Sequence, residues 1–477
     1  MTTQDILQDA HKKAVEINAG ELIHAGFLPK SGLIFPAILY PPAIKIAKKC
    51  NITEDQFFAD YKATGPFVIY VHIPFCVNRC NFCHFVTKTG SPSEQVDLYL
   101  NAIEQEMDLY LKRLSLTKIP TAAILIGGGT ATNMTPRQME RFLAAFTKRL
   151  DLSCCEQFTI DTDPTTILGA DGEEKLETLV RFGADRITIG AQNFDNAILK
   201  KMNRAHTAEE IKIAVKSARE HGFNNISVDL IYGYPGQTLE GWIDTVQQAL
   251  ELDVDAFQAF ELRVYSGSLI DGPTPVHFHR SPGDFPGVDE RTSMKAGAIL
   301  VAEEHGYYDG DYNYLFSKKT GMTSQYQEKR SSLLYDTLAF GMSAQSVLGG
   351  SIAINEFASM ARYCSEVAEG RIPLVRGKTR TLDDILRRTV ISTLRTRRFL
   401  SKDEYQKRTG RDINDVFGKK INALKKYGLL TEDEENLRLT ERGYYFADTL
   451  CMQFHHPDFL PFERNEYHEG ELNPYNN

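Results

Sequence analysis

Short apolar segments alternate with longer segments of helical periodicity between residues 66 and 265. The apolar segments are residues 68–73, 122–128, 158–163, 186–191, 226–233 and 256–264, and the helical segments lie near 94–115, 136–150, 172–182, 207–221 and 238–251. Continuous apolar strands that alternate with helices are typical of a parallel sheet covered by helices. Six such units predict an α/β fold with a partial (β/α)6 barrel of the TIM type, in which the chemistry takes place at the carboxyl ends of the strands.

The rest of the sequence predicts smaller units around this barrel. Residues 1–65 combine an amphipathic helix with a proline-rich stretch and predict an N-terminal arm. Residues 66–310 then form the barrel, and 311–379 extend it. Within the barrel unit, residues 266–286 are rich in glycine and proline and predict a loop. Charged helices and a short pair of strands in 380–477 predict a small, winged-helix-like C-terminal domain. The arm and this domain are candidate lids.

Composition and charge narrow the range of partners. The chain has 477 residues, a net charge of -9 and eight cysteines, which are too few for a disulfide scaffold. An acidic chain gives no electrostatic reason to expect a nucleic-acid partner. No segment approaches the roughly 18 consecutive apolar residues of a membrane helix, and the first 20 residues lack the apolar core of a signal peptide. We therefore expect a cytoplasmic protein that acts on a small molecule, without a nucleic-acid or membrane partner.

Three of the eight cysteines lie close together in the sequence. Cys76, Cys80 and Cys83 form a C-x3-C-x2-C spacing in the loop predicted after the first strand. Three thiolates hold a four-iron cluster and leave one iron without a protein bond. That iron can bind the amino and carboxylate groups of S-adenosylmethionine (SAM), whose sulfonium is then cleaved by an electron to give a 5′-deoxyadenosyl radical. Zinc is the alternative, but zinc sites use two separated ligand pairs, no second pair follows, and His84 is poorly placed beside Cys83.

The sequence around these cysteines resembles the radical SAM superfamily. The cysteine spacing matches the signature of the superfamily, and IGGGT at 126–130 is similar to its glycine motif. Glycines allow close approach of the backbone to a ligand because they lack a Cβ. The wider sequence resembles the oxygen-independent coproporphyrinogen III oxidase (HemN) family in YVHIPFC, IGGGTAT, FTIDTDP, RITIGAQNF, MNRAHT, ISVDLIYGYPGQT and EGRIPLVRG. This resemblance implies a [4Fe–4S] cluster, one or two SAM molecules, and flavodoxin or ferredoxin as the electron donor.

The resemblance also assigns roles to individual residues. It implies that SAM is contacted by Gly127, Gly128, Gly129, Thr130, Asp161, Gln192, Arg204 and Asp229. It places Tyr70 and His72 near the cluster, and these are the candidate catalytic residues. Each assignment has a structural alternative: Asp161 as a helix cap, Arg204 in a structural ion pair, and Tyr70 in the core.

Two departures from the classical oxidases keep three functional classes open. Phe85 stands where those oxidases carry a fourth cysteine, and residues 305–330 do not show the pattern of the oxidases. The protein is therefore expected to act on a tetrapyrrole, to be a methyltransferase or cyclopropane-forming enzyme with two SAM molecules, or to be a non-catalytic haem chaperone. An enzyme needs an apolar pocket beside the cluster, for which the candidates are Phe257, Phe260, Tyr265 and Phe340. A chaperone needs exposed haem ligands, for which the candidates are His277, His279, His455 and His456.

Overall fold

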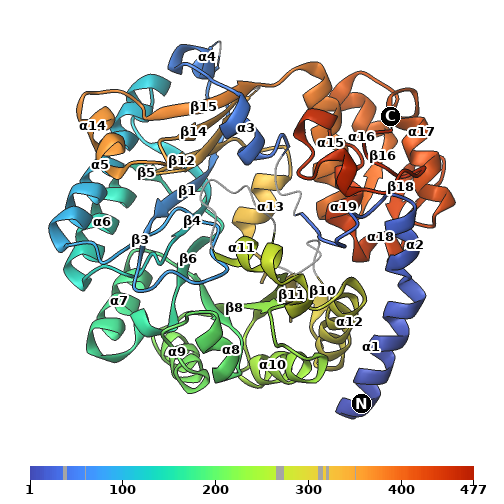
Figure 1. The fold of residues 1–477 in the computed structure, drawn as a ribbon. Coiled ribbons are helices and arrows are strands. Elements are labelled where there is room, and N and C mark those ends of the chain that lie inside the picture. The colour runs from blue at the N-terminus through green and yellow to red at the C-terminus, as the bar shows by residue number, and fades with distance from the viewer. Residues whose placement is uncertain are drawn as a thin grey trace.

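The structure is a computed structural model that describes residues 1–35, 40–59, 61–264, 273–309, 315–318, 322–349 and 351–476. Figure 1 shows a curved central sheet with helices around its outside and a separate group of C-terminal helices beside its open edge. Tyr265, one of the predicted pocket residues, lies outside the described residues. No helix in the described part of the chain is long and apolar enough to cross a membrane.

The central sheet is parallel, as the sequence predicts. Its strands are β1 (Phe67–Ile73), β4 (Ile119–Gly128), β6 (Phe158–Thr162), β7 (Arg186–Gln192), β8 (Asn225–Tyr232), β9 (Ala256–Glu261) and β12 (Thr337–Phe340). They lie in the order β9-β8-β7-β6-β4-β1-β12, and every neighbouring pair in this run is parallel. The predicted α/β fold with a partial barrel is thus confirmed. The carboxyl ends of the strands share one edge, where the cysteine loop begins.

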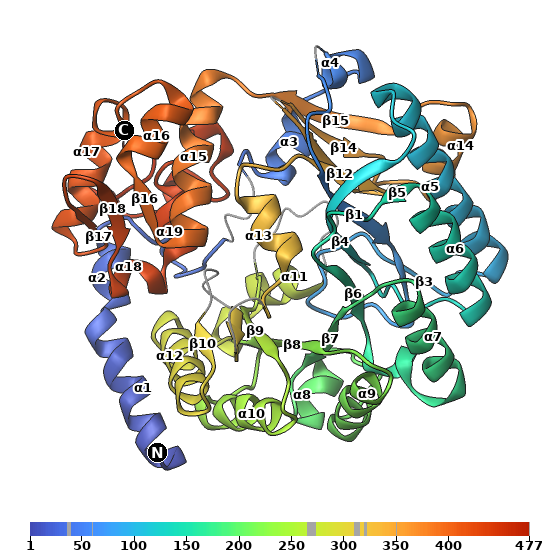
Figure 2. The ribbon, with the colours of Figure 1, turned by 180° about the vertical axis from the view of Figure 1, so that it is seen from behind.

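Helices cover the outside of the barrel (Figures 1 and 2). They are α5 (Ser93–Leu114), α6 (Pro136–Lys148), α7 (Gly169–Arg181), α8 (Asn196–Lys201), α9 (Ala208–Glu220), α10 (Leu239–Glu251) and α12 (Val288–Glu304). Both α6 and α9 begin with a capping box, formed by Thr135 with Gln138 and by Thr207 with Glu210. Each box satisfies backbone groups that the first helical turn leaves unpaired, which explains why these helices start where they do.

Antiparallel strands extend both edges of the parallel sheet. At the β12 edge follow β13 (Gln345–Leu348), β14 (Ser351–Asn355) and β15 (Leu374–Thr379), and at the β9 edge follow β11 (Leu315–Ser317) and β10 (Tyr308–Asp309). Shorter elements are β2 (Phe75–Cys76), β3 (Lys88–Thr89), β5 (Leu150–Asp151), the 3₁₀ turn η1 (Pro164–Ile167), α13 (Gln325–Ser331) and α14 (Met360–Ala368). α13 contacts β1 and β4, and α14 packs against α5.

The N-terminal arm wraps along the outside of the barrel (Figure 1). It contains α1 (Thr3–Ile17), α2 (Ala19–His24), α3 (Ala43–Lys49) and α4 (Glu54–Phe58). α1 packs against α12 and α10, while α3 and α4 contact the antiparallel strands.

The C-terminal part has the order of helices and strands of a winged helix. Its elements are α15 (Leu382–Arg397), β16 (Phe399–Ser401), α16 (Lys402–Thr409), α17 (Ile413–Lys426), β17 (Leu430–Glu432) and β18 (Asn436–Leu439), with the strands in the order β16-β18-β17. They are followed by α18 (Glu441–Tyr445), α19 (Ala447–Met452) and the 3₁₀ turns η3 (Pro457–Phe459) and η4 (Arg464–Glu466).

The arm and the C-terminal helices share one apolar core, separate from the barrel core. Leu22 and Phe27 of the arm pack with Leu394 and Tyr405 in this core. Arg442 adds polar links, because its guanidinium donates to the carbonyls of residues 17 and 18 and to the carboxylate of residue 21. Two segments at opposite ends of the sequence thus form one packed unit, while the predicted domain boundaries stay predictions.

One predicted loop contains a helix. Within 266–286, residues Pro273–Arg280 form α11 and Pro282–Asp284 form a 3₁₀ turn, η2. Both prolines of α11 stand in its first turn, where a missing N–H costs no helical hydrogen bond. The proline content predicted a loop, but at these positions it is compatible with a helix.

Candidate functional site

The cysteine loop starts at the carboxyl end of β1 and is anchored on both sides. The amide of Gly129 donates to Ile73 and that of Thr130 to Phe75, so the glycine motif after β4 holds the start of the loop. Further along, the amide of Asn81 donates to Met202, and the side chain of Asn203 donates to the carbonyl of residue 79. These bonds place all three cysteines, as free thiols of intermediate exposure, beside the ends of β1 and β4.

The surroundings of the three thiols fit a metal cluster. Burial raises the pKa of Cys76 to about 12 and raises that of Cys83. A thiol in such surroundings becomes a thiolate only when positive charge, such as iron, binds to it. Donors are already in place: Nη1 of Arg204 lies 3.1 Å from Sγ of Cys80, and Oγ1 of Thr130 lies 3.7 Å from Sγ of Cys76. Three neighbouring cysteines, with Phe85 in place of a fourth, suit a cluster with one open iron.

The glycine motif leaves room for a ligand against the cysteines. A Cβ on Gly129 would lie 2.9 Å from Sγ of Cys76, and a Cβ on Gly127 would lie 2.5 Å from Oδ2 of Asp161. Any other residue at these two positions would push a side chain into the site. The structure therefore brings the predicted glycines, the first cysteine and the predicted acidic residue of β6 to one point.

A second carboxylate and an arginine lie deeper in the barrel. Burial raises the pKa of Asp161 to about 6 and, with repulsion from Asp161, raises that of Asp229 to about 8. Gln258 donates to Oδ1 of Asp229 at 2.8 Å. Arg186, at the start of β7, is fully buried and lowers the pKa of both carboxyls. Its Nε and Nη2 have no hydrogen-bond partner among the described residues.

Arg186 was not identified from the sequence, nor was Asp163 as the ion-pair partner of Arg204. Nη2 of Arg204 lies 2.6 Å from Oδ2 of Asp163, two residues beyond Asp161. Although burial would raise the pKa of Asp163, Arg204 and His206 hold it well below its usual value. Two features of the sequence point to these residues. Arg186 is a charged residue in the apolar segment RITIGA, and Asp163 is the second aspartate of FTIDTDP. The structural ion pair weighed for Arg204 therefore exists, alongside its contact with Cys80.

Gln192 lies at an irregularity of the sheet beside Arg204. Its φ of +66° is in the left-handed region, and the register of β7 against β8 shifts between Ile189 and Gln192. Bulges of this kind re-aim side chains and are common next to active sites. A Cβ on Gly190 would lie 2.8 Å from Nε2 of Gln192 and 3.5 Å from Nη2 of Arg204, so these two predicted SAM contacts flank the same glycine.

Tyr70 and His72 form a short hydrogen-bonded chain to the cysteine loop. The hydroxyl of Tyr70 donates to Nδ1 of His72 at 2.9 Å, and Nε2 of His72 donates to the carbonyl of Val86 at 2.9 Å. Burial lowers the pKa of His72 to about 4, so its imidazole is neutral at pH 7. The ring of Tyr70 lies 6.0 Å from that of Tyr326 in α13. The geometry gives His72 a positioning role for the loop, and a catalytic role for either residue stays a prediction.

Two of the predicted pocket residues belong to the core instead. Phe257 stacks on Phe316, and Phe340 packs edge-on against Tyr110, all within the core that the sheet shares with its outer helices. Successive side chains of a strand point to opposite faces, so Phe257 and Phe260, three residues apart, face opposite ways. Phe260, by contrast, lines the pocket described below.

The candidate haem ligands are mostly engaged elsewhere. His455 is 0% exposed and packs against Tyr40, so the expected exposed ligand is wrong at this position. His456 accepts the amide of Asp458, and His277 pairs with Asp284 at 2.8 Å. The zinc alternative gains no support from His84, whose Nε2 donates to the carbonyl of Arg263 at 3.0 Å.

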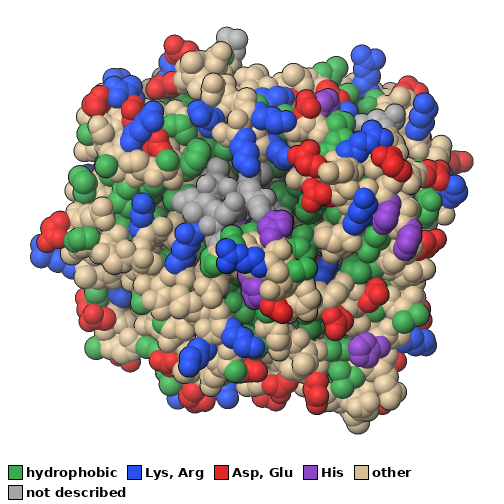
Figure 3. All heavy atoms as spheres, viewed as in Figure 1, with side chains coloured by type: hydrophobic (Ala, Val, Ile, Leu, Met, Phe, Trp, Pro, Cys, Tyr) green, Lys and Arg blue, Asp and Glu red, His purple; other side chains and the backbone are tan. Residues whose placement is uncertain are grey.

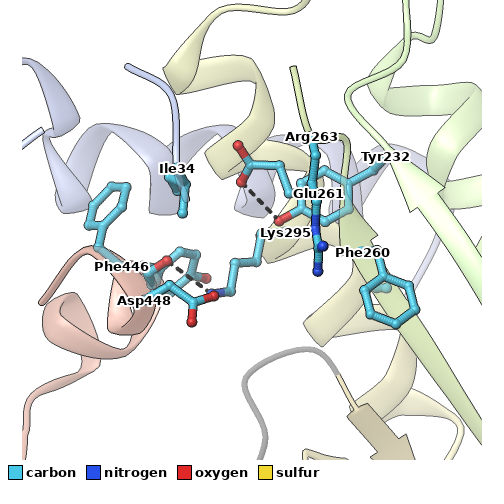
Figure 4. A pocket seen from close by; sticks show the side chains of 10 residues that line it. Ile34, Tyr232, Phe260, Glu261, Arg263, Lys295, Phe446 and Asp448 are labelled. Atoms are coloured by element: carbon cyan, nitrogen blue, oxygen red, sulfur yellow. Dashed lines mark hydrogen bonds between the residues drawn. The ribbon is translucent and has the colours of Figure 1, made fainter. Parts of the chain in front are cut away.

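A pocket opens next to this last contact, between the barrel, α12 and the C-terminal helices (Figure 4). Its walls are Ile34, Tyr232, Ala259, Phe260, Glu261, Arg263, Lys295, Tyr445, Phe446 and Asp448. Figure 3 shows that one whole face of the molecule carries acidic and basic side chains side by side, without a broad basic area.

Comparisons with known proteins agree with this geometry. The sequence matches the radical SAM superfamily over residues 70–249 and the HemN C-terminal domain over residues 381–446. A protein of Bacillus subtilis named heme chaperone HemW is 28% identical, over 81% of this chain and 98% of its own length. The oxygen-independent coproporphyrinogen III oxidase of Helicobacter pylori strain 26695 is 25% identical, over 87% of this chain and 92% of its own length.

The fold agrees as well. The structure of coproporphyrinogen III oxidase (HemN) from Escherichia coli, described as a radical SAM enzyme, superposes with a TM-score of 0.73 at 26% identity. The match covers 86% of this chain and 95% of that chain. Proteins of this superfamily use a [4Fe–4S] cluster and SAM. The chain belongs to the radical SAM superfamily and is HemN-like, with both a radical SAM domain and a HemN C-terminal domain.

Proposed function

We propose that this protein cleaves SAM reductively at a [4Fe–4S] cluster held by Cys76, Cys80 and Cys83, and that it acts on a tetrapyrrole. The observation that carries the proposal is the convergence of the glycine motif, Asp161 and Arg204 on these thiols at the carboxyl ends of the strands. When bound, the cluster and SAM supply a 5′-deoxyadenosyl radical, with one electron from a flavodoxin or ferredoxin.

In this proposal the residues of the protein bind and orient the cluster and SAM. Arg204 donates to the sulfur of Cys80 and stabilises its thiolate. At pH 7, Asp161 with a pKa of about 6 accepts hydrogen bonds, while Asp229 with a pKa of about 8 keeps its proton and can donate one. The two carboxyls interact, so they titrate as a pair. Together the two carboxyls provide one hydrogen-bond acceptor and one donor for the hydroxyl and amine groups of one SAM molecule or of a second.

The tetrapyrrole substrate is supported by the named activities of the relatives. Oxidative decarboxylation is the reaction that the Escherichia coli and Helicobacter pylori names favour. The name of the Bacillus subtilis relative favours haem binding instead, but His455 is buried and cannot bind haem without unfolding its surroundings. Methyl transfer is a further outcome of the experiment below.

Anaerobically reconstituted protein, incubated with labelled SAM and a panel of porphyrinogens and haem, tests the proposal by mass spectrometry. We expect 5′-deoxyadenosine to depend on Cys80, so that Cys80→Ala abolishes it while Cys154→Ala, at an exposed thiol outside the site, does not. Carbon dioxide in the products identifies an oxidase and S-adenosylhomocysteine a methyltransferase. Haem binding without cleavage of SAM would contradict the proposal.

A further inference from the structure

The pocket of Figure 4 is lined by two cations, Arg263 and Lys295, and by two carboxylates, Glu261 and Asp448, and each carboxylate is paired with an arginine that does not line the pocket. Glu261 binds Arg291 at 2.8 Å, and Asp448 binds Arg395 at 2.8 Å. Both arginines are almost fully buried. The remaining cations, Arg263 and Lys295, are therefore not neutralised by an ion pair of their own.

Arg263 offers its whole guanidinium to the pocket. Figure 4 shows the side chain extending from the end of β9 into the space between Phe260 and Lys295. Within the described residues it has no hydrogen-bond or ion-pair partner. Its backbone is fixed, because the carbonyl of Arg263 accepts the bond from His84, the residue after Cys83. A guanidinium fork whose donors are not yet used is suited to binding a carboxylate with two parallel hydrogen bonds.

Lys295 is positioned by the C-terminal helices and keeps a free donor. Its Nζ donates to the carbonyls of Tyr444 and Tyr445 and lies 4.8 Å and 5.4 Å from the centres of their rings. An ammonium has three donors, so two carbonyls leave one for a ligand. Asp309, the other acidic group near Lys295, is paired with Arg398 at 2.9 Å. Burial lowers the pKa of Lys295 to about 8, which an anionic ligand would raise again.

The other walls are apolar. Ile34 comes from the arm, Ala259 and Phe260 from the barrel, and Phe446 from the C-terminal helices. Such walls suit the flat apolar body to which a carboxylate is attached. From this combination we infer that Arg263 and Lys295 bind a carboxylate side arm of the substrate, and so fix the position of an apolar ring system beside the cluster loop. This inference rests on the proposed function, whose tetrapyrrole substrates carry such arms.

Binding to the reconstituted holoprotein with SAM omitted tests the assignment. The probes are coproporphyrin III, followed by its fluorescence, and 3-phenylpropionate, followed by saturation-transfer NMR. We expect Arg263→Gln to weaken both by about tenfold or more, because charge-assisted hydrogen bonds are lost. Arg263→Lys should restore part of the affinity. The matched control is Arg280→Gln, which removes the same charge from an exposed position of α11. Cluster absorbance and the melting temperature show that each variant is folded.

The outcomes separate this inference from the proposed function. If wild type binds 3-phenylpropionate in an Arg263-dependent way but does not bind coproporphyrin, the carboxylate site stands and the tetrapyrrole proposal fails. If Arg263→Gln and Arg280→Gln bind both probes equally, the carboxylate site is overturned. A loss confined to S-adenosylhomocysteine, tested as a third probe, would also overturn it, because the bound carboxylate would then be that of the cofactor.

Discussion

Arg204 places its Nη1 3.1 Å from Sγ of Cys80 while its Nη2 lies 2.6 Å from Oδ2 of Asp163. One guanidinium thus joins the cysteine loop to the end of β6. Because Asp163 holds the fork in place, the hydrogen bond to sulfur has a fixed direction. Hydrogen bonds to the sulfurs are one of the features that set the reduction potential of an iron–sulfur cluster.

Arg204→Met should lower the reduction potential of the cluster by on the order of tens of millivolts, because a donor and a positive charge are lost. It should also destabilise the fold by about 3–5 kcal/mol, since the buried carboxylate of Asp163 loses its guanidinium partner. Adding Asp163→Asn should recover most of the stability but not the potential. An anaerobic redox titration followed by EPR, with Arg280→Met as the control, measures this. Equal potentials in the double variant and the control would refute the link.

Gly129→Ala should prevent assembly of the cluster. The new Cβ would lie 2.9 Å from Sγ of Cys76 and 2.7 Å from the backbone of Pro74, and backbone atoms cannot move aside cheaply. We expect less than about half the iron per chain of wild type, by the rule that overpacking a fixed site forces its neighbours out of position. Gly283→Ala is the matched control, because a Cβ there meets nothing within 4 Å. Full iron content in Gly129→Ala would contradict this prediction, because the cysteine loop would then have moved aside to accommodate the new Cβ.

The sequence predicts the barrel well because each of its strands is a continuous apolar segment with turn residues at both ends. The cysteine spacing and the glycine motif are equally local patterns, so the sequence also predicts the central residues of the candidate site. What local patterns do not reveal is pairing across long separations. Arg204 and Asp163 are 41 residues apart in the sequence. Arg186 lowers the pKa of Asp229 because both side chains lie in the barrel interior.

The direction in which a side chain points is the second feature that the sequence does not predict. Phe257 and Phe260 were equivalent as apolar residues near a strand end, but the pleat turns one to the core and the other to the pocket. His455 was placed among exposed ligands because it lies near the chain end. It is buried because the tail folds back on Tyr40 of the arm, a contact between residues 415 positions apart that no local pattern encodes.

Asp229→Asn should make the stability of the protein less dependent on pH. Burial and Asp161 raise the pKa of Asp229 from 3.8 to about 8 in the folded state, so between these values the folded state binds more protons than the unfolded state. Stability therefore falls as pH rises through this range. Asparagine keeps the acceptor for Gln258 and carries no charge.

The free energy of unfolding of Asp229→Asn, relative to that of wild type, should thus rise by at least about 2 kcal/mol between pH 5 and pH 8, at about 1.4 kcal/mol per pKa unit. Urea unfolding of both proteins at several pH values measures it. Asp171→Asn, at an exposed position of α7, is the control. A difference between Asp229→Asn and wild type that does not change with pH would contradict the raised pKa.

Phe462→Ala should expose the cluster to oxygen. Phe462 of the C-terminal tail is buried in an apolar cluster with Leu33, Phe35 and Phe285, against which Phe82, between the second and third cysteines, also packs. Removing its ring leaves a cavity and loosens the cover over the cysteine loop, at a cost of about 3–5 kcal/mol for a fully buried phenylalanine. The expected result is faster loss of cluster absorbance in air, and more SAM cleaved without substrate turnover.

Phe399→Ala is the matched control, because this phenylalanine is 38% exposed on β16 in the C-terminal winged-helix-like part. Its loss should leave the rate of bleaching in air near that of wild type. The decisive comparison is made at a temperature where both variants are fully folded, so that bleaching reports on access and not on global unfolding. If both variants then bleach at the wild-type rate, the tail does not shield the cluster, and the exclusion of oxygen has to come from the barrel alone.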